Sequence, residues 1–231
     1  MFRRLSVLLL ALLAVVAAER PVIKIALVGD STVNDEGGWG PGFRAWFDAR
    51  MEIHNFAMNG RSSKSFRDEK RWEPVLAFKP DYVLIQFGHN DIPGKGPERE
   101  TDAKTTFREN LARYIAEARA AGAKPILVTS IVRRNFDAEG KIKRDSLAPY
   151  VETARELAAA EHVPLMDLYA LTLKQSEDLG PRATESLGAR DKTGKLDTTH
   201  LGPVGQKEIG ALAAREFARV EPAIEPYLHK P

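Results

Sequence analysis

The strongest constraint on this chain is a regular alternation of short apolar segments with longer amphipathic ones. The apolar segments are nearly continuous, which predicts strands buried on both faces, as in a parallel sheet. They span residues 22–28, 51–56, 81–87, 125–130 and 163–167. This alternation is typical of a three-layer α/β domain, in which helices cover both faces of a parallel sheet of about five strands.

Three amphipathic segments predict helices, at residues 105–121, 146–160 and 204–220. In the first of them the apolar residues recur on one stripe, and a glycine directly follows its end. The 231 residues contain no internal repeat, low-complexity tract or interdomain linker. We therefore expect a single domain, which spans residues 19–231 once the leader described next is removed.

The first 18 residues have the pattern of a secretory signal peptide. Arg3 and Arg4 precede an apolar run at residues 5–16, and small residues follow it. The run is too short to span a bilayer comfortably, although an uncleaved anchor is the alternative interpretation. The pattern predicts export to the periplasm or the extracellular space, with no membrane attachment after cleavage.

Charge and composition exclude several classes of protein. The whole chain has 34 Lys and Arg against 32 Asp and Glu, and the predicted leader holds two of the arginines. The remaining chain is thus balanced, which argues against a nucleic-acid partner. It has no cysteine, so disulfides, thiol catalysis and cysteine zinc sites are ruled out. GxSxG, P-loop and GxGxxG motifs are missing as well.

Unusual polar residues follow the first three predicted strands, at the sheet edge where ligands bind in α/β domains. Ser31 lies in a tight turn, where its hydroxyl can enter the crevice and its N–H can face a developing oxyanion. Gly60 can bring a bare N–H close to a ligand, although by itself it fits an ordinary turn glycine better. Asn90 offers a carboxamide that can donate a neutral hydrogen bond to an oxyanion.

Of the five histidines, only His200 has a carboxylate three residues upstream in the same loop. Asp197 can accept its Nδ1–H and leave Nε2 as a base. His89 either takes part in catalysis or supports its loop beside Asn90. A metal site built from His89, Asp91, Asp197 and His200 is an alternative, but the chain lacks a recognised ligand spacing. We expect no metal and no cofactor.

Taken in chain order, Ser31, Gly60, Asn90 and His200 resemble the four name-giving residues of the SGNH, or GDSL, hydrolase superfamily. The surrounding sequence is similar to the rhamnogalacturonan acetylesterase branch of that superfamily. This similarity extends from residue 22 to about residue 217. It is concentrated in five segments, at residues 29–32, 37–40, 59–66, 86–91 and 197–201.

The resemblance implies a flavodoxin-like sheet with strand order 2-1-3-4-5 and a metal-free acyl-enzyme mechanism. Ser31 would be the nucleophile, His200 the general base, and Asp197 the residue that orients the imidazole. The oxyanion hole would consist of the N–H groups of Ser31 and Gly60 and the Asn90 side chain. The implied activity is that of a carboxylic ester hydrolase that removes O-acetyl groups from a plant cell-wall polysaccharide, rhamnogalacturonan or pectin.

Three further residues are candidate contacts for an acetylated polysaccharide or oligosaccharide. Trp39 can stack on a sugar ring, or it belongs to the core. Arg61, next to Gly60, can bind a uronate carboxylate, although the basic stretch at residues 61–71 is also typical of a solvated helix face. Arg133 follows the fourth predicted strand and, with its neighbour Arg134, can line the cleft from the other side.

Two other functions remain open from the sequence. One is an SGNH esterase or lipase of other or broad specificity, acting for example on acetyl-xylan or on small acyl esters. The other is a non-catalytic carbohydrate-binding protein on the same scaffold. Ser31, Asn90, Asp197 and His200 are all in place, which argues against the second.

Overall fold

The structure, a computed structural model, describes residues 22–229, so the predicted signal peptide at residues 1–18 lies outside the described residues. The five predicted strands form one parallel sheet in the order β2-β1-β3-β4-β5. The expected flavodoxin-like order is therefore confirmed. The strands are β1 (Ile23–Gly29), β2 (Met51–Asn55), β3 (Tyr82–Gln86), β4 (Lys124–Val128) and β5 (Leu165–Met166).

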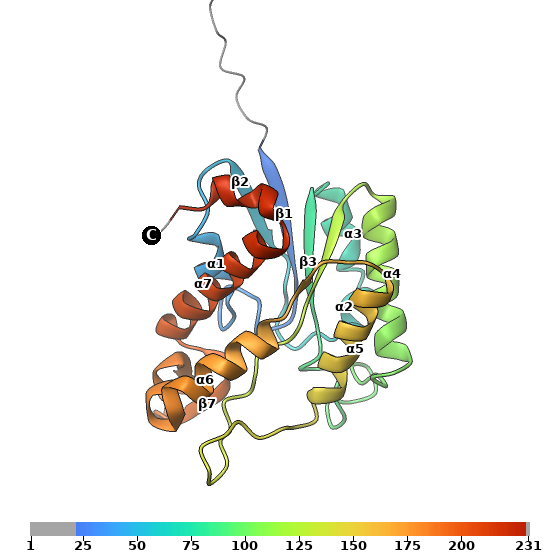
Figure 1. Ribbon diagram of the computed structural model, residues 1–231. Helices are drawn as coiled ribbons and strands as arrows, with labels where there is room; N and C mark the ends of the chain where they lie inside the picture. The colour runs from blue at the N-terminus through green and yellow to red at the C-terminus, as the bar shows by residue number, and fades with distance from the viewer. Residues whose placement is uncertain (1–21, 230–231) are drawn as a thin grey trace, which may run out of the picture.

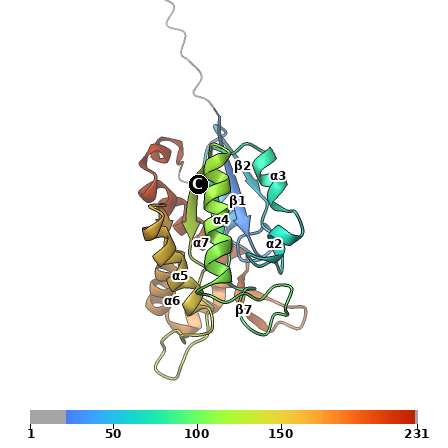
Figure 2. The same ribbon diagram turned by 90° about the vertical axis from the view of Figure 1, so that its right-hand side faces the viewer.

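Helices cover both faces of this sheet and complete the three predicted layers (Figure 1). One face carries α1 (Gly40–Arg44), α6 (Leu168–Thr184) and α7 (Pro203–Val220). Figure 2 shows α4 running along the other face. The helices there are α2 (Ser65–Asp68), α3 (Trp72–Ala77), α4 (Thr106–Ala120) and α5 (Ala148–Ala160).

The central strands are largely apolar because both of their faces are buried. In β1, Ala26 and Val28 belong to the core beneath α4 and α5, whereas Ile25 and Leu27 belong to the core beneath α1 and α7. Successive side chains of a strand point to opposite faces, so two cores require a continuous apolar run. This is the pattern that indicated the parallel sheet in the sequence.

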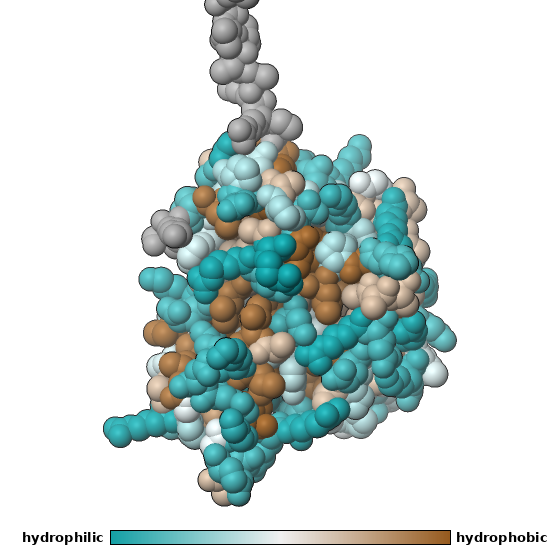
Figure 3. All heavy atoms as spheres, viewed as in Figure 1, coloured by the Kyte–Doolittle hydropathy of each residue, from teal (hydrophilic) through white to brown (hydrophobic). Residues whose placement is uncertain are grey.

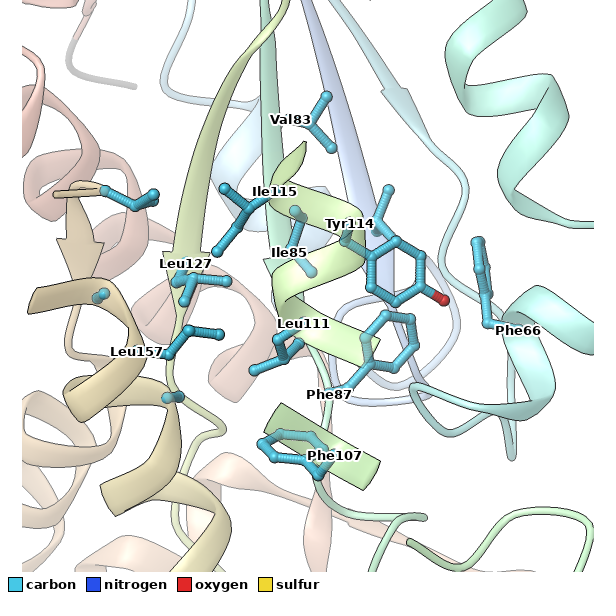
Figure 4. Packing of buried hydrophobic residues seen from close by; sticks show 14 of the residues in the cluster. Phe66, Val83, Ile85, Phe87, Phe107, Leu111, Tyr114, Ile115, Leu127 and Leu157 are labelled. Carbon is cyan, nitrogen blue, oxygen red and sulfur yellow. The ribbon is translucent and has the colours of Figure 1, made fainter. Parts of the chain in front are cut away.

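Aromatic rings in the first of these cores lie directly beneath the loops at the strand ends (Figure 4). Phe87, the residue after β3, stacks on Tyr114 of α4 with ring centroids 5.6 Å apart. The Tyr114 hydroxyl donates a hydrogen bond to the carbonyl oxygen of Ser63, at 2.9 Å. The core thereby supports the loop that follows β2 and the loop that follows β3.

Helices α1 and α7 approach so closely that their backbones touch. A Cβ atom at Gly42 would lie 1.9 Å from the carbonyl oxygen of Gln206, and one at Gly210 would lie 2.3 Å from the carbonyl carbon of Gly42. Only glycine fits at either position without a shift of the backbone. This contact joins the segment that follows β1 to the last long helix of the chain.

Helix α6 and a small antiparallel hairpin were not predicted from the sequence. Gly180, with φ of 74°, interrupts α6 and precedes Pro181, which masks its helical pattern. The hairpin pairs β6 (Gly188–Arg190) with β7 (Leu196–Leu201). Short 3₁₀ turns lie at Glu185–Leu187 and Pro222–Tyr227.

The face seen in Figure 3 is mostly hydrophilic, with hydrophobic residues gathered toward its middle. No helix within residues 22–229 combines the length and the apolar composition that a membrane crossing requires.

Candidate active site

A cleft of about 720 Å³ opens where the loops after the strands meet β7. These loops lie along the lower edge of the sheet in Figure 1. Parallel strands place the residues that follow them at one edge of the sheet, as the sequence analysis assumed. Residues from each of these loops line the cleft: Ser31 after β1, Gly60 after β2, Asn90 after β3 and Arg133 after β4. Asp197 and His200 in β7 line it as well.

Ser31, His200 and Asp197 form a continuous chain of hydrogen bonds in this cleft. The distance from Ser31 Oγ to His200 Nε2 is 2.8 Å, and the distance from His200 Nδ1 to Asp197 Oδ2 is 2.7 Å. The side chains of His200 and Asp197 are 37% and 38% exposed, so a ligand in the cleft can reach them. The structure thus brings Ser31 together with Asp197 and His200, which their spacing in the sequence had already paired.

Asp197 is held as a carboxylate that accepts hydrogen bonds. Its Oδ1 accepts the backbone N–H groups of Thr199 and His200, at 2.7 and 2.9 Å. Partial burial opposes ionisation, but the bonds from the His200 ring and from these N–H groups outweigh it and hold the pKa of Asp197 below its ordinary value. The carboxylate therefore stays charged and fixes the orientation of the imidazole.

A buried hydrogen-bond chain fixes the turn that carries Ser31. The hydroxyl of Thr32 donates to Asp30 Oδ1 at 2.8 Å and accepts from Gln86 Nε2 at 2.7 Å. The indole N–H of Trp39 donates to Gln86 Oε1 at 2.9 Å. The turn next to the serine is thereby tied to the end of β3.

Trp39 is fully buried, so the prediction that it stacks on a sugar ring is wrong. Its ring packs edge-on against Phe43 in the core beneath α1 and α7, with centroids 5.5 Å apart. No face of the indole is left for a ligand. The core interpretation, which the sequence left open, is the one that the structure shows.

The three predicted oxyanion donors line the same cleft. Gly60 has φ of 75°, a conformation that favours glycine. Within residues 22–229, neither the Ser31 N–H nor the Gly60 N–H donates to a protein acceptor. Asn90 Nδ2 donates one hydrogen to the carbonyl oxygen of Arg61, at 3.2 Å. That bond fixes the carboxamide and leaves its second N–H available.

His89 is buried and supports its loop. Its Nε2 donates to the carbonyl oxygen of Ile131 at 3.1 Å. Burial, reinforced by the positive charges of Arg133 and Lys95, lowers the pKa of His89 to about 3. The ring is therefore neutral, and its hydrogen bond joins the loop after β3 to the loop after β4.

Asp91 is also buried and links neighbouring loops. It accepts from the Ser63 hydroxyl at 2.5 Å and from the Thr101 hydroxyl at 3.1 Å. Burial raises its pKa to about 7. Among the residues that the structure describes, no three His, Cys, Asp or Glu side chains gather as metal ligands. The alternative metal site, which needed His89 and Asp91 beside His200, is not assembled there.

Arg134, which the sequence offered with Arg133 as a residue of the cleft lining, is absent from that lining and supports the site instead. It is 7% exposed, and its guanidinium donates to the carbonyl oxygens of His200 at 2.6 Å and Asp197 at 3.1 Å. A longer contact of 3.4 Å reaches the carbonyl oxygen of Thr199. Burial lowers the pKa of Arg134 to about 10, so it keeps its charge at neutral pH. It holds the Asp197–His200 segment from behind.

The two arginines predicted to contact substrate are both paired with carboxylates. Arg61 is absent from the lining of the cleft, and its Nε lies 3.0 Å from Glu69. Arg133 does line the cleft, but its side chain is only 16% exposed and pairs with Asp145 at 2.9 Å. The structure therefore does not place Arg61 where a uronate in the cleft would meet it.

A five-stranded flavodoxin-like sheet with a Ser–His–Asp chain at its carboxyl edge defines the class of SGNH-type ester hydrolases. Residues 27–207 match the GDSL-like Lipase/Acylhydrolase family, and the chain belongs to this family. It is accordingly a carboxylic ester hydrolase.

Known proteins of this family resemble the chain over most of its length. It is 34% identical to the rhamnogalacturonan acetylesterase RhgT of Bacillus subtilis, over 83% of this chain and 88% of that protein. It is 26% identical to an acetylxylan esterase of Xylanibacter ruminicola, over 70% of this chain and 39% of that protein. Among solved structures, the Bacillus subtilis protein YXIM superposes with a TM-score of 0.74 at 26% identity, which covers 85% of this chain and 56% of that chain.

Proposed function

We propose that this protein is an exported carbohydrate esterase that removes O-acetyl groups from rhamnogalacturonan through an acyl-enzyme. The observation that carries the proposal is the 2.8 Å contact between Ser31 Oγ and His200 Nε2 in an open cleft. The relative RhgT, which matches the chain over most of its length, supports the choice of substrate. The N-terminal leader supports export.

In the first step, Ser31 Oγ attacks the carbonyl carbon of the acetyl group while His200 Nε2 accepts the serine proton. The carbonyl oxygen becomes an oxyanion, which accepts hydrogen bonds from the Ser31 N–H, the Gly60 N–H and Asn90 Nδ2. Asp197 stabilises the imidazolium that forms. None of the three donors needs to reorganise, because two are free backbone N–H groups and the third is held by the Arg61 carbonyl.

The tetrahedral intermediate then collapses. His200 returns its proton to the departing sugar hydroxyl, and the acetyl group stays on Ser31 Oγ as an ester. A water molecule gives its proton to His200 and attacks this ester through a second oxyanion. Ser31 regains its proton from His200, and acetate leaves.

Acetyl-xylan is the second candidate substrate, because the chain also resembles the acetylxylan esterase of Xylanibacter ruminicola. The decisive experiment measures acetate release from acetylated rhamnogalacturonan and from acetyl-xylan at matched acetyl concentration. Faster release from rhamnogalacturonan supports the proposal. Faster release from xylan refutes the substrate and leaves the esterase activity standing.

The proposed nucleophile has its own test. Ser31→Ala should lower kcat on an aryl acetate by several orders of magnitude, since members of a triad act as a unit. An active Ser31→Ala protein would refute the mechanism. A wild-type protein that binds the polysaccharide but releases no acetate from any ester would instead be a binding protein on a hydrolase scaffold. Export is tested separately, by sequencing the N-terminus of the secreted protein, which should begin at Glu19.

A further inference from the structure

Lys95 is a cation of the cleft that has no carboxylate partner. It lies on the loop between β3 and α4, is half-buried, and lines the cleft with Asn90 and Ser31. Within residues 22–229 its ammonium forms no ion pair and donates no hydrogen bond. The other lysine or arginine of the cleft lining, Arg133, is already paired with Asp145. The positive charge of Lys95 is thus available to a ligand.

The loop that carries Lys95 is fixed by its own hydrogen bonds. The N–H of Gly96 donates to Glu100 Oε1 at 2.7 Å, and the Lys64 ammonium donates to the carbonyl oxygen of Pro97 at 2.7 Å. At the end of the loop, the Tyr150 hydroxyl donates to the carbonyl oxygen of Thr101 at 2.6 Å. A cation on a pre-organised backbone loses less conformational entropy when it binds an anion.

The cleft lining has a negative charge and a positive charge on different loops, and this arrangement favours one orientation of an anionic ligand. Glu36 also lines it, on the loop after β1, and its carboxylate accepts a hydrogen bond from the Asn59 side chain. Lys95 belongs to a different loop and lies close enough to His89 for its charge to depress the pKa of that ring. A carboxylate in the cleft is therefore repelled by Glu36 and attracted by Lys95.

Resting on the proposed function, we propose that Lys95 binds the carboxylate of a uronic acid residue in the acetylated substrate. This contact favours acidic over neutral polysaccharide backbones. Recognition of the uronate carboxylate, which the sequence suggested for Arg61, is thus assigned to Lys95. An ammonium on a flexible stem can follow the carboxylate, whereas the Arg61 guanidinium is engaged by Glu69 and by the carbonyl oxygen of Asn59.

The test compares two forms of one substrate. Acetylated rhamnogalacturonan oligosaccharides are assayed with free uronic acids and after methyl esterification of those acids, which removes the charge and keeps the acetyl groups. The readout is the ratio of kcat/KM for the free acid to kcat/KM for the ester. We expect a ratio of about 3 to 10 for the wild-type protein at low salt, in the range of a partly exposed charge-assisted contact, and a smaller ratio at high salt.

Three variants complete the design. Lys95→Gln should bring the ratio close to 1, mainly through KM, and Lys95→Arg should keep most of it. Lys79→Gln is the matched control, because Lys79 is exposed just before β3, at the other end of the sheet. It should keep the wild-type ratio and the wild-type rate on an aryl acetate.

The outcomes distinguish failure of the role of Lys95 from failure of the proposed function. If Lys95→Gln keeps the wild-type ratio, the proposed role of Lys95 is overturned. The proposed deacetylation of rhamnogalacturonan is not affected by that result. Equal losses in Lys95→Gln and Lys79→Gln show a general charge effect and overturn it as well. If the wild-type protein releases acetate from xylan and from neither rhamnogalacturonan form, both proposals fail together.

Discussion

Arg134 offers a sharp test of how this site is held, because it touches the backbone of the Asp197–His200 segment and none of the proposed reacting atoms. Arg134→Met keeps most of the volume of the side chain and removes the guanidinium. The change leaves two carbonyl oxygens, previously bonded at 2.6 and 3.1 Å, without their charged donor.

Losing a buried partner costs about 1–3 kcal/mol for each polar group that is left unpaired. The carbonyls belong to half-buried residues, so water will replace part of what is lost. We therefore expect the free energy of unfolding to fall by about 2–3 kcal/mol. For a domain of this size, that change lowers Tm by about 4–12 °C.

The substitution should also slow catalysis in the protein that remains folded. A misplacement of a reacting group by about 1 Å costs about 100-fold in rate. We expect Arg134→Met to lower kcat on an aryl acetate by about 10- to 100-fold at a temperature where the variant is folded, with little change in KM. The kcat of Arg134→Lys should lie between those of the wild-type protein and Arg134→Met, because an ammonium keeps the charge but cannot reproduce the planar fork of donors.

The assay pairs steady-state hydrolysis with thermal unfolding of the same samples. Arg113→Met is the control, since Arg113 is 63% exposed on α4 and its contact with Glu117 is 3.9 Å long. It should change neither quantity appreciably. A folded Arg134→Met protein with wild-type kcat would show that the carbonyl contacts are dispensable for the geometry of the site.

Three further predictions concern groups around the cleft. Asn90→Ala should lower kcat by about 10²–10³-fold with little change in KM, because its carboxamide meets charge that exists only in the transition state; a raised KM with normal kcat would contradict that role. Burial raises the pKa of Asp91 from 3.8 to about 7, so its contribution to stability is complete below pH 3.8 and is lost as the pH rises toward 7; Asp91→Asn should remove this part of the pH dependence in thermal unfolding. Trp39→Phe should cost about 1–3 kcal/mol of stability by leaving Gln86 Oε1 unpaired, with no change in KM for the polysaccharide, since the indole is buried.

The fold was predictable because its signal is local and repeated. Each central strand needs a continuous apolar run to serve two cores, and each run is visible in the sequence. The order of the strands is a non-local property, and it came from the resemblance to a family. Helix α6 escaped detection because Gly180 and Pro181 interrupt its pattern, and β7 because its side chains are half-buried and mixed in polarity.

The candidate site divides in the same way. Asp197 and His200 are three residues apart in the sequence, so their spacing alone indicated a pair, although they lie in β7 and not in the loop that was expected. The contact between Ser31 and His200 spans 169 residues and is visible only in the structure. The roles of Trp39 and Arg61 could not be assigned from sequence, because burial and pairing with Glu69 depend on tertiary packing. The sequence marks Arg134 only by its place after the fourth strand, and its supporting role has no sequence signal, since its partners are backbone carbonyls.

Ser31 and His200 are far apart along the chain, so enzymatic activity requires both ends of the domain to be folded. The proposed nucleophile lies near the beginning of the described chain, and its base lies just before α7, which docks on α1 through Gly42 and Gly210. A partially synthesised chain can form β1, β2 and β3 and still hold no base. Ester hydrolysis should thus appear only after the segment that carries His200 has closed onto the N-terminal half, so that acetate release can be used to time this closure during folding.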